Sequence, residues 1–377
     1  MTSAARRPAA DAPDPGLPSA AAGPSGLAPA VSRIRVRRPL AIATAALVAA
    51  MVVGVLVGPA GLPAATVAQS LLAKMPWHPV LSVPAIDVSI VWQIRLPRVI
   101  LAALVGAMLA GGGAAYQGVF RNPLADPYLL GVAAGAGLGA TLNIVSGASS
   151  GLLPLTAFAG AAIAVAVTYV LGTSAGRDIG SPGIGGTTAS IVLAGVAVAA
   201  LFTAVQEYLQ QQSSQQLQQI YAWILGELSQ ASWSDVTLIL PYAVISAALL
   251  IAHRRLLDVL QVGEAEASSL GVNVARLRLT VVIAATLGTA AAVAVSGLIG
   301  FVGIIVPHTV RLTAGASYRI VLPVSMVGGA AFLVLADIAA RTVQAPAEVP
   351  LTVITATIGA PFFLFVLRSR RTRSDLS

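Results

Sequence analysis

Long uncharged apolar runs recur along this chain of 377 residues. Residues 99–120 contain no charged side chain, and residues 128–176 contain none either, although Ser, Gly and Pro interrupt the second stretch near 146–154. A helix needs about 20 apolar residues to cross a bilayer. Only 10% of all residues are charged, against about 25% in soluble domains. The sequence therefore predicts an all-α integral membrane protein.

The apolar runs predict about ten transmembrane helices. They cover residues 40–57, 99–120, two runs within 128–176, and then 191–206, 236–252, 279–295, 297–307, 320–336 and 349–367. The eighth run, 297–307, is broken by glycines and is short for a span, and His308 beside it is expected to cap the inner end of its helix. In the third span, Gly131, Gly135 and Gly139 recur every four residues, which predicts close packing against another helix.

The distribution of positive charge predicts the topology. With ten spans and a cytoplasmic N-terminus, only Lys74, Arg95, Arg98 and Arg341 lie outside, which leaves 18 of the 22 Lys and Arg residues inside. This asymmetry obeys the positive-inside rule. We therefore expect a multi-pass protein of the cell membrane with both termini in the cytoplasm. The arginines lie at span ends, so the net charge of +8 indicates a membrane protein and no nucleic-acid partner.

Three regions are expected along the chain. Residues 1–32 are rich in Ala, Pro and Gly and predict a disordered cytoplasmic tail. Residues 33–368 form the ten-span membrane domain, and residues 369–377 form a cytoplasmic C-terminal tail. The basic residues before the first span resemble a signal peptide, but the many later spans favour an uncleaved first span.

The longest polar interruption between spans, residues 253–278, is expected to be cytoplasmic. Four of its residues recur at helical spacing and predict one face of a short helix along the membrane surface, with Glu264 on another side: Val259, Val262, Ala265 and Ser269. Gly271 can end this helix in a left-handed conformation, and Asn273 can cap the next one. Such a helix is either a docking surface or an ordered connector without a partner.

Catalytic chemistry has little support in the sequence. The three histidines, His78, His253 and His308, are far apart and form no metal-ligand motif, cysteine is absent, and no phosphate-binding loop occurs. Asp337 lies four residues before Arg341, which favours a helical ion pair over a proton relay. No catalytic or metal-binding residue is therefore predicted.

The outer arginines leave two interpretations open. Arg95, Arg98 and Arg341 each lie near the end of a span. They are expected either to reach toward lipid headgroups or to bind carboxylates of an extracytoplasmic partner, since Arg forms bidentate pairs with carboxylates.

Several motifs, in the same order, resemble the FecCD/BtuC family of ABC importer permeases, the type II importers. The motifs are RLPR at 95–98, GAMLAG at 106–111, QGVFRNPLADPYLLG at 117–131, GEAEASSLGV at 263–272, GFVGIIVPH at 300–308, LAD at 335–337 and TIGAPF at 357–362. The resemblance extends from about residue 40 to residue 368. It implies a ten-span, BtuC-like permease fold.

The resemblance also implies partners and roles. The subunit is expected to pair with a second permease, identical or different, and to bind two ABC ATPases and an extracytoplasmic substrate-binding protein. ATP and Mg²⁺ would bind to the ATPases, so this chain is expected to be no enzyme and to hold no cofactor. The residues expected to couple to the ATPases are Val259, Val262, Gly263, Glu264, Glu266, Ser269, Leu270, Gly271 and Val272.

The remaining expectations concern the extracytoplasmic side and the cargo. Arg95, Arg98 and Arg341 match the family's binding-protein docking positions, and Thr203 and Gln206 are expected to line the translocation path. Ferric siderophore is the expected cargo, with cobalamin or haem as alternatives. A stand-alone secondary carrier is the rival class, and it would need a coupling acid in the membrane.

Overall fold

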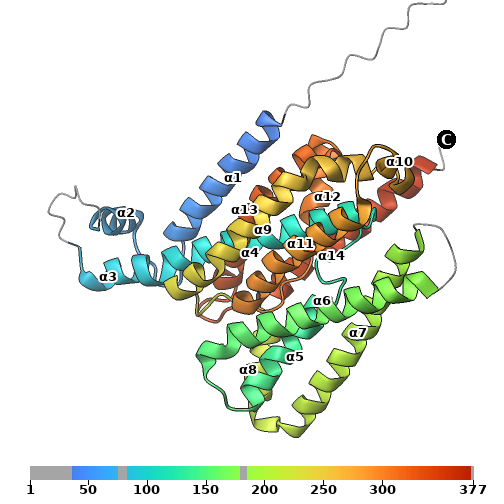
Figure 1. Cartoon of the computed structure of the whole chain (residues 1–377). Coiled ribbons are helices and arrows are strands. Elements are labelled where there is room, and N and C mark those ends of the chain that lie inside the picture. Colours follow the sequence, from blue (N-terminus) through green and yellow to red (C-terminus); the bar gives the residue numbers. More distant parts are fainter. Residues whose placement is uncertain (1–35, 75–82, 179–184, 375–377) are drawn as a thin grey trace, which may run out of the picture. The chain divides into compact units, whose positions relative to one another are not determined.

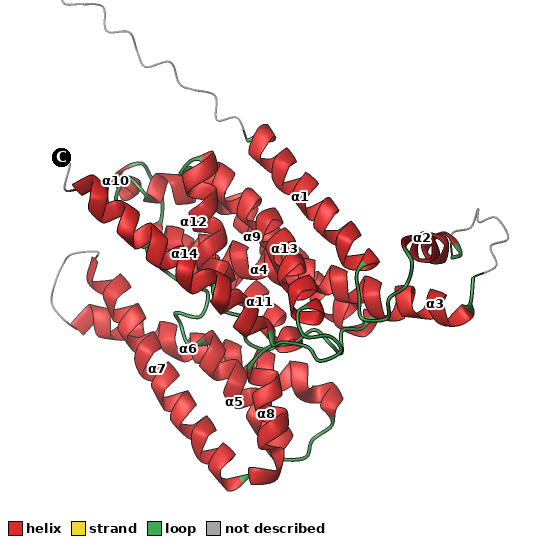
Figure 2. Ribbon diagram, turned by 180° about the vertical axis from the view of Figure 1, so that it is seen from behind, coloured by secondary structure: helices red, strands yellow, loops and turns green. Residues whose placement is uncertain are grey.

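The computed structural model describes residues 36–74, 83–178 and 185–374, and every regular element in these residues is a helix (Figures 1 and 2). Within them, seven segments are long and apolar enough to cross a membrane: α1 (Arg37–Leu56), the continuous α3 to α4 segment (Ala85–Val119), α6 (Leu153–Asp178), α7 (Gly185–Gln212), α9 (Trp233–Leu260), α11 (Val274–Ser296) and α13 (Tyr318–Thr342). Three further apolar helices of the described chain are α5 (Val132–Val145), α12 (Val302–Ala314) and α14 (Leu351–Ser374). These helices correspond to the ten predicted runs, and the all-α membrane fold is confirmed.

Short helices occupy some of the connections. They are α2 (Ala64–Leu72), α8 (Leu217–Ile224) and α10 (Glu264–Ser269). The segment before α4 consists of α3 (Ala85–Ser89) and the π-helix η1 (Ile90–Arg95), which runs directly into α4 (Leu96–Val119). The second predicted run began at residue 99, whereas the helix begins earlier, because residues 85–95 are helical and continue without a break into α4.

Helix α4 lies at the centre of the described bundle and contacts α9, α11, α12 and α13. In the most apolar stretch of the α3 to α4 segment 78% of residues are buried, whereas 17% are buried in the corresponding stretch of α7. Small residues allow this close packing: a Cβ added to Gly106 would lie 2.2 Å from the carbonyl oxygen of Gly329 on α13. In lipid, such backbone approach provides the packing that holds helices together.

Helices α5, α6 and α7 pack against one another, and their contact confirms most of the glycine prediction. A Cβ on Gly135 would lie 2.3 Å from the carbonyl oxygen of Gly160, and one on Gly139 would lie 2.1 Å from that of Thr156. Gly131 has a different role, because it precedes α5 with a φ of 84° and forms the turn into the helix. Two of the three glycines therefore form the packing face.

Several predicted boundaries shift. Residues 253–260 continue α9 and residues 274–278 begin α11, so the polar interruption is mostly helix. Helix α14 continues to Ser374, so residues 369–374 of the predicted C-terminal tail are helical, and the cytoplasmic location of this tail stays a prediction. The predicted tail 1–32 lies outside the described residues.

The glycine-broken eighth span begins later than expected. Residues 297–301 form a turn with positive φ at Gly297 and Phe301, and helix α12 follows. His308 lies in the middle of α12 and contacts the ring of Phe362 on α14 edge-on, with 6.1 Å between ring centroids. The expectation that His308 caps the inner end of its helix is therefore wrong.

Candidate functional site

The coupling segment, defined here as residues 259–272, connects α9 to α11 through the six-residue helix α10. Gly271 has a φ of 83° and ends this turn, as predicted. The backbone N–H of Val272 then donates to the carbonyl oxygen of Ala267 at 3.0 Å. Asn273 caps α11, since its side-chain oxygen accepts a hydrogen bond from the N–H of Arg276 at 2.9 Å. The end of α10 and the start of α11 are therefore both fixed by backbone conformation and hydrogen bonds.

A buried ion pair fastens α10 to α11. A guanidinium nitrogen of Arg278 lies 2.6 Å from a carboxylate oxygen of Glu264, and the two side chains are only 6% and 10% exposed. Ala267, three residues along α10, is fully buried. The inward face of α10 thus contains Glu264 and Ala267.

This arrangement corrects the predicted amphipathic face. Val262, Ala265 and Ser269 are exposed, and Val259 belongs to the last turn of α9. A strong ion pair turned Glu264 inward, which apolar periodicity alone does not reveal. Of the other predicted coupling residues, Gly263 is buried, Val272 packs against the core, and Glu266 is exposed.

The outward face of the coupling segment presents apolar side chains at its two ends. Val262 is 69% exposed and Leu270 is 70% exposed. They flank a helix whose own backbone and inward face are fixed by the contacts above. The segment is therefore a small, anchored projection with an apolar surface. In Figures 1 and 2, α10 lies at the same end of the bundle as the C-terminal end of α14.

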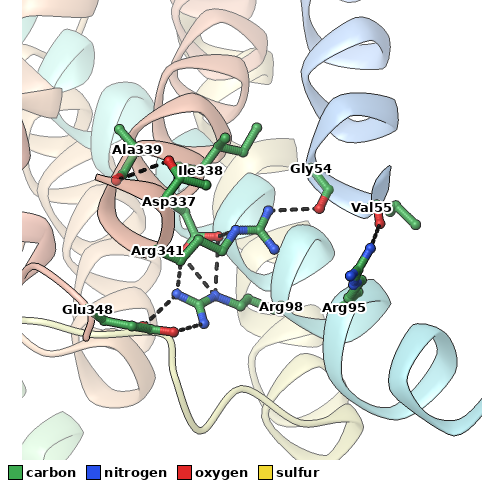
Figure 3. Close-up of polar contacts among 10 residues, drawn as sticks. Gly54, Val55, Arg95, Arg98, Asp337, Ile338, Ala339, Arg341 and Glu348 are labelled. Carbon is green, nitrogen blue, oxygen red and sulfur yellow. Dashed lines mark hydrogen bonds and ion pairs between the residues drawn. The ribbon is translucent and has the colours of Figure 1, made fainter. Parts of the chain in front are cut away.

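A buried charge cluster lies at the start of α4 and the end of α13 (Figure 3). Arg98 donates to both carboxylate oxygens of Asp337, at 2.8 to 3.2 Å, and forms a two-nitrogen pair with Glu348 at 2.7 and 2.8 Å. The hydrogen bonds from Arg98 hold the pKa of Glu348 below its usual value. Arg98 therefore joins α4 to α13 and to the loop before α14.

Arg341 and Arg95 complete the cluster by binding the end of α1. Arg341 pairs with Asp337 one helical turn earlier at 3.4 Å, as predicted, and donates to the carbonyl oxygen of Gly54 at 2.7 Å. Arg95 donates to the carbonyl oxygens of Val55 and Leu56 at 2.9 and 2.8 Å. The last carbonyls of a helix lack partners and carry partial negative charge, so both arginines stabilise the C-terminus of α1.

These contacts bear on the two readings of the outer arginines. All three are buried, with 2% to 6% of their surface exposed, so they do not extend toward lipid headgroups. Docking of a binding protein by these arginines stays a prediction. The geometry weighs against it, since a partner's carboxylate would have to reach groups that already bind within the chain.

The two predicted path residues do not share one surface. Thr203 on α7 is exposed, whereas Gln206 is buried. A Cβ on Gly137 of α5 would lie 2.6 Å from the side-chain oxygen of Gln206, so Gln206 packs against the neighbouring helix. A role in the translocation path stays a prediction for both Thr203 and Gln206.

The two histidines that the structure describes, His253 and His308, belong to no metal-binding group in the described residues. In the described part of the chain no group of three or more His, Cys, Asp or Glu side chains is placed to hold an ion. His253 shares a hydrogen bond with the carbonyl oxygen of Leu249 at 2.8 Å, and His78 lies outside the described residues.

Comparison with known proteins decides the family. The model of the FecCD transport family matches residues 46–369. The chain belongs to this family. It is 45% identical over 294 residues to the cobalamin import system permease protein BtuC of Halobacterium salinarum, covering 78% of this chain and 77% of the relative. The hemin transport system permease protein HmuU of Yersinia pestis is 43% identical over 75% of this chain and 85% of its own length.

Two further relatives extend the comparison. The Fe(3+)-citrate import system permease protein YfmE of Bacillus subtilis is 36% identical, covering 74% of this chain and 82% of the relative. A solved metal-chelate type ABC transporter in an inward-facing conformation superimposes with a TM-score of 0.74 at 30% identity, covering 88% of this chain and 98% of that one. The FecCD member described here is thus a multi-pass permease subunit of an ABC importer and not itself an enzyme, and the family implies ATPase and binding-protein partners.

Sequence reasoning missed the two acidic partners of Arg98. Glu348 lies 250 residues from Arg98 and Asp337 lies 239 residues from it, so no local spacing connects them. The one available signal was scarcity, because only 14 acidic residues occur in the whole chain and an acid near a span end then needs a nearby cation.

Proposed function

We propose that this FecCD family permease imports a ferric siderophore. In this proposal its coupling segment contacts the ATPases and transmits their movement to the membrane helices. The observation that supports the coupling role is the anchored projection at residues 259–272, where Val262 and Leu270 are exposed. An ordered connection between membrane helices with exposed apolar side chains suits contact with a partner, and the family implies an ATPase partner for this chain. We place this surface, and both termini, in the cytoplasm because 18 of 22 Lys and Arg residues then lie inside.

The mechanism follows from how the coupling segment is anchored. Two ATPase subunits contact the coupling segments of two permeases and move them when ATP binds and is hydrolysed. The Glu264–Arg278 pair transmits this movement to α11, since a buried ion pair at 2.6 Å holds the two helices together. The helices then alternate between states open to either side, and the cargo passes between the two permeases.

The binding protein docks at the opposite end of the bundle, where the charge cluster lies. In this proposal Arg95, Arg98 and Arg341 hold α1, α4 and α13 in a fixed arrangement at the docking face, because each of them binds within the chain. The cluster also disfavours the secondary carrier. Asp337, the fully buried acid of the described residues, is paired with both Arg98 and Arg341, an arrangement that suits a structural ion pair between helices.

The cargo assignment is supported by two relatives. The solved transporter is of the metal-chelate type by its title, and the permease YfmE of Bacillus subtilis is named for Fe(3+)-citrate. The cobalamin and hemin permeases are more alike in sequence, at 45% and 43% identity, and they make cobalamin and haem the alternatives. Permeases named for different cargoes all match this chain over about three quarters of its length, which is expected if the binding protein supplies most of the selection.

Uptake by cells tests this assignment. We would delete the gene, restore it with the wild-type chain or an empty vector, and follow labelled ferric siderophore, haem and cobalamin. Loss of siderophore uptake alone, restored by the wild-type chain, is the expected result. Loss of haem or cobalamin uptake with normal siderophore uptake would replace the cargo. Unchanged uptake of all three would reject the proposed cargo class.

A further inference from the structure

A second polar cluster, beside the coupling segment, begins at the end of α9. Asp258 lies four residues before Val262, and its carboxylate accepts hydrogen bonds from the hydroxyl of Ser317 at 2.8 Å and from the backbone N–H of Tyr318. Ser317 is the residue that precedes α13, so the carboxylate sits at the positive end of that helix. The last turn of α9 therefore holds the first turn of α13.

The contact continues from α13 to α12. Tyr318 is buried, and its hydroxyl accepts a hydrogen bond from Arg311 at 3.1 Å. The guanidinium also lies 5.6 Å from the centre of the Tyr318 ring, in cation–π contact. The ring itself lies against Gly118 of α4, where an added Cβ would come within 2.9 Å of it. A residue larger than glycine at 118 would displace this ring.

Arg311 then binds Gln117 on α4, which connects both ends of α12. The side-chain oxygen of Gln117 accepts from Arg311, and its amide nitrogen donates to the carbonyl oxygen of Gly303 at 3.0 Å and to that of Ala125 at 3.2 Å. Gln117 is almost fully buried. Every polar atom of this amide group is thus used to hold α12 and the turn after α4.

The coupling segment also makes a direct contact beside this cluster. Gln261, between α9 and α10, donates to the carbonyl oxygen of Gly118 at 2.9 Å. Residues 259–272 and the adjoining Asp258 therefore contact both α4 and α13 directly.

We propose that the inner cluster, defined as Asp258, Ser317, Tyr318, Arg311 and Gln117, transmits the displacement of the coupling segment to α12 and α13. It is a set of positioning residues for transport, and it rests on the proposed coupling role of residues 259–272. Its members belong to four helices and are linked by direct hydrogen bonds. The Glu264–Arg278 pair reaches only α11, so the inner cluster provides a separate route to α12 and α13.

The test uses the assembled importer in proteoliposomes and measures cargo transported per ATP hydrolysed. Tyr318→Phe removes the hydroxyl that Arg311 binds and keeps the ring on Gly118. Arg311→Lys keeps the charge but cannot hold Gln117 and Tyr318 with one planar group. We expect each variant to lower transport per ATP by about fivefold, the factor for one lost hydrogen bond, while ATP hydrolysis and the melting temperature stay near wild type.

Arg319→Gln is the matched control. Arg319 also approaches Asp258, at 3.6 Å, but its side chain is 48% exposed, so its removal should leave transport per ATP unchanged. The double variant Tyr318→Phe with Arg311→Lys should lose no more than Arg311→Lys alone, because both changes break the link between Arg311 and Tyr318. Additive losses, or losses that follow the melting temperature, would show a merely structural role and overturn the proposal.

A further variant separates this inference from the proposed function. Leu270→Glu alters only the exposed tip of the coupling segment. If Leu270→Glu abolishes coupling while Tyr318→Phe and Arg311→Lys leave it intact, the coupling role holds and the inner cluster is rejected. If Leu270→Glu itself transports normally, the coupling role is rejected. The proposal for the inner cluster, which rests on that role, is then rejected as well.

Discussion

Replacing Asp337 by asparagine removes the anion that holds two buried arginines. Asp337 is fully buried and lies 2.8 Å from Arg98 and 3.4 Å from Arg341. The variant Asp337→Asn keeps the size of the side chain and leaves the cluster with three cations and the single acid Glu348. Breaking a buried ion pair by removing one partner costs about 3–5 kcal/mol, because the remaining charge is buried without compensation. We expect a loss of this order in the free energy of unfolding.

Thermal unfolding of the purified subunit in detergent measures this loss, together with the amount of the chain in membranes. Glu348→Gln is the control, since it removes the other acid bound to Arg98, but one that is 30% exposed. We expect it to cost about 1 kcal/mol or less, as for partly exposed pairs. Both acids bind Arg98, but Asp337 is buried and also pairs with Arg341, so the comparison contrasts the buried, doubly paired acid with the partly exposed one.

A compensating change completes the experiment. Asp337→Asn combined with Arg341→Gln removes one cation with the anion, and should regain more than half of the lost stability. If Asp337→Asn unfolds like the wild type, or if the double variant is no more stable than the single one, the cluster does not hold the helices by charge pairing and the reasoning fails.

Two further predictions concern packing and coupling. Gly139→Val should sharply reduce the folded chain in membranes, because its Cβ would lie 2.1 Å from the carbonyl oxygen of Thr156, whereas Gly300→Ala, where nothing lies within 4 Å, should not; equal amounts of both variants would contradict the close approach of α5 and α6. Glu264→Gln should reduce uptake more than it reduces the amount of protein, because Arg278 loses its carboxylate at 2.6 Å and α10 its fixed link to α11; uptake in proportion to protein would contradict this.

The membrane fold was predictable because a single physical rule governs it. A bilayer requires long apolar helices, so the ten runs could be located from composition and length. The end of α10 was equally predictable, because it depends on nearby residues. Gly271 adopts the positive φ that glycine favours, and Asn273 caps the next helix within four residues. Such features depend on neighbours in the sequence and can be read from it.

The charge clusters were not predictable, because they depend on contacts between distant segments. Nothing near Glu264 in the sequence indicates that it turns inward, since Arg278 reaches it from the next helix. The three outer arginines were read as exposed groups, but their acids and carbonyl partners come from α1, α13 and the loop before α14. The helices also extend beyond the predicted apolar runs, because polar residues continue a helix once its hydrogen bonds are established.

The most direct test of the coupling role compares uptake by the wild-type chain with that of Leu270→Glu and Leu270→Met. Leu270 is 70% exposed, so neither change should disturb the fold, and the amount of chain in the membrane should stay at the wild-type level. We predict that Leu270→Glu abolishes uptake while the ATPases continue to hydrolyse ATP, and that Leu270→Met, which keeps an apolar surface, transports normally. Normal uptake by Leu270→Glu at wild-type amounts would contradict the assignment of residues 259–272 as the contact with the ATPases.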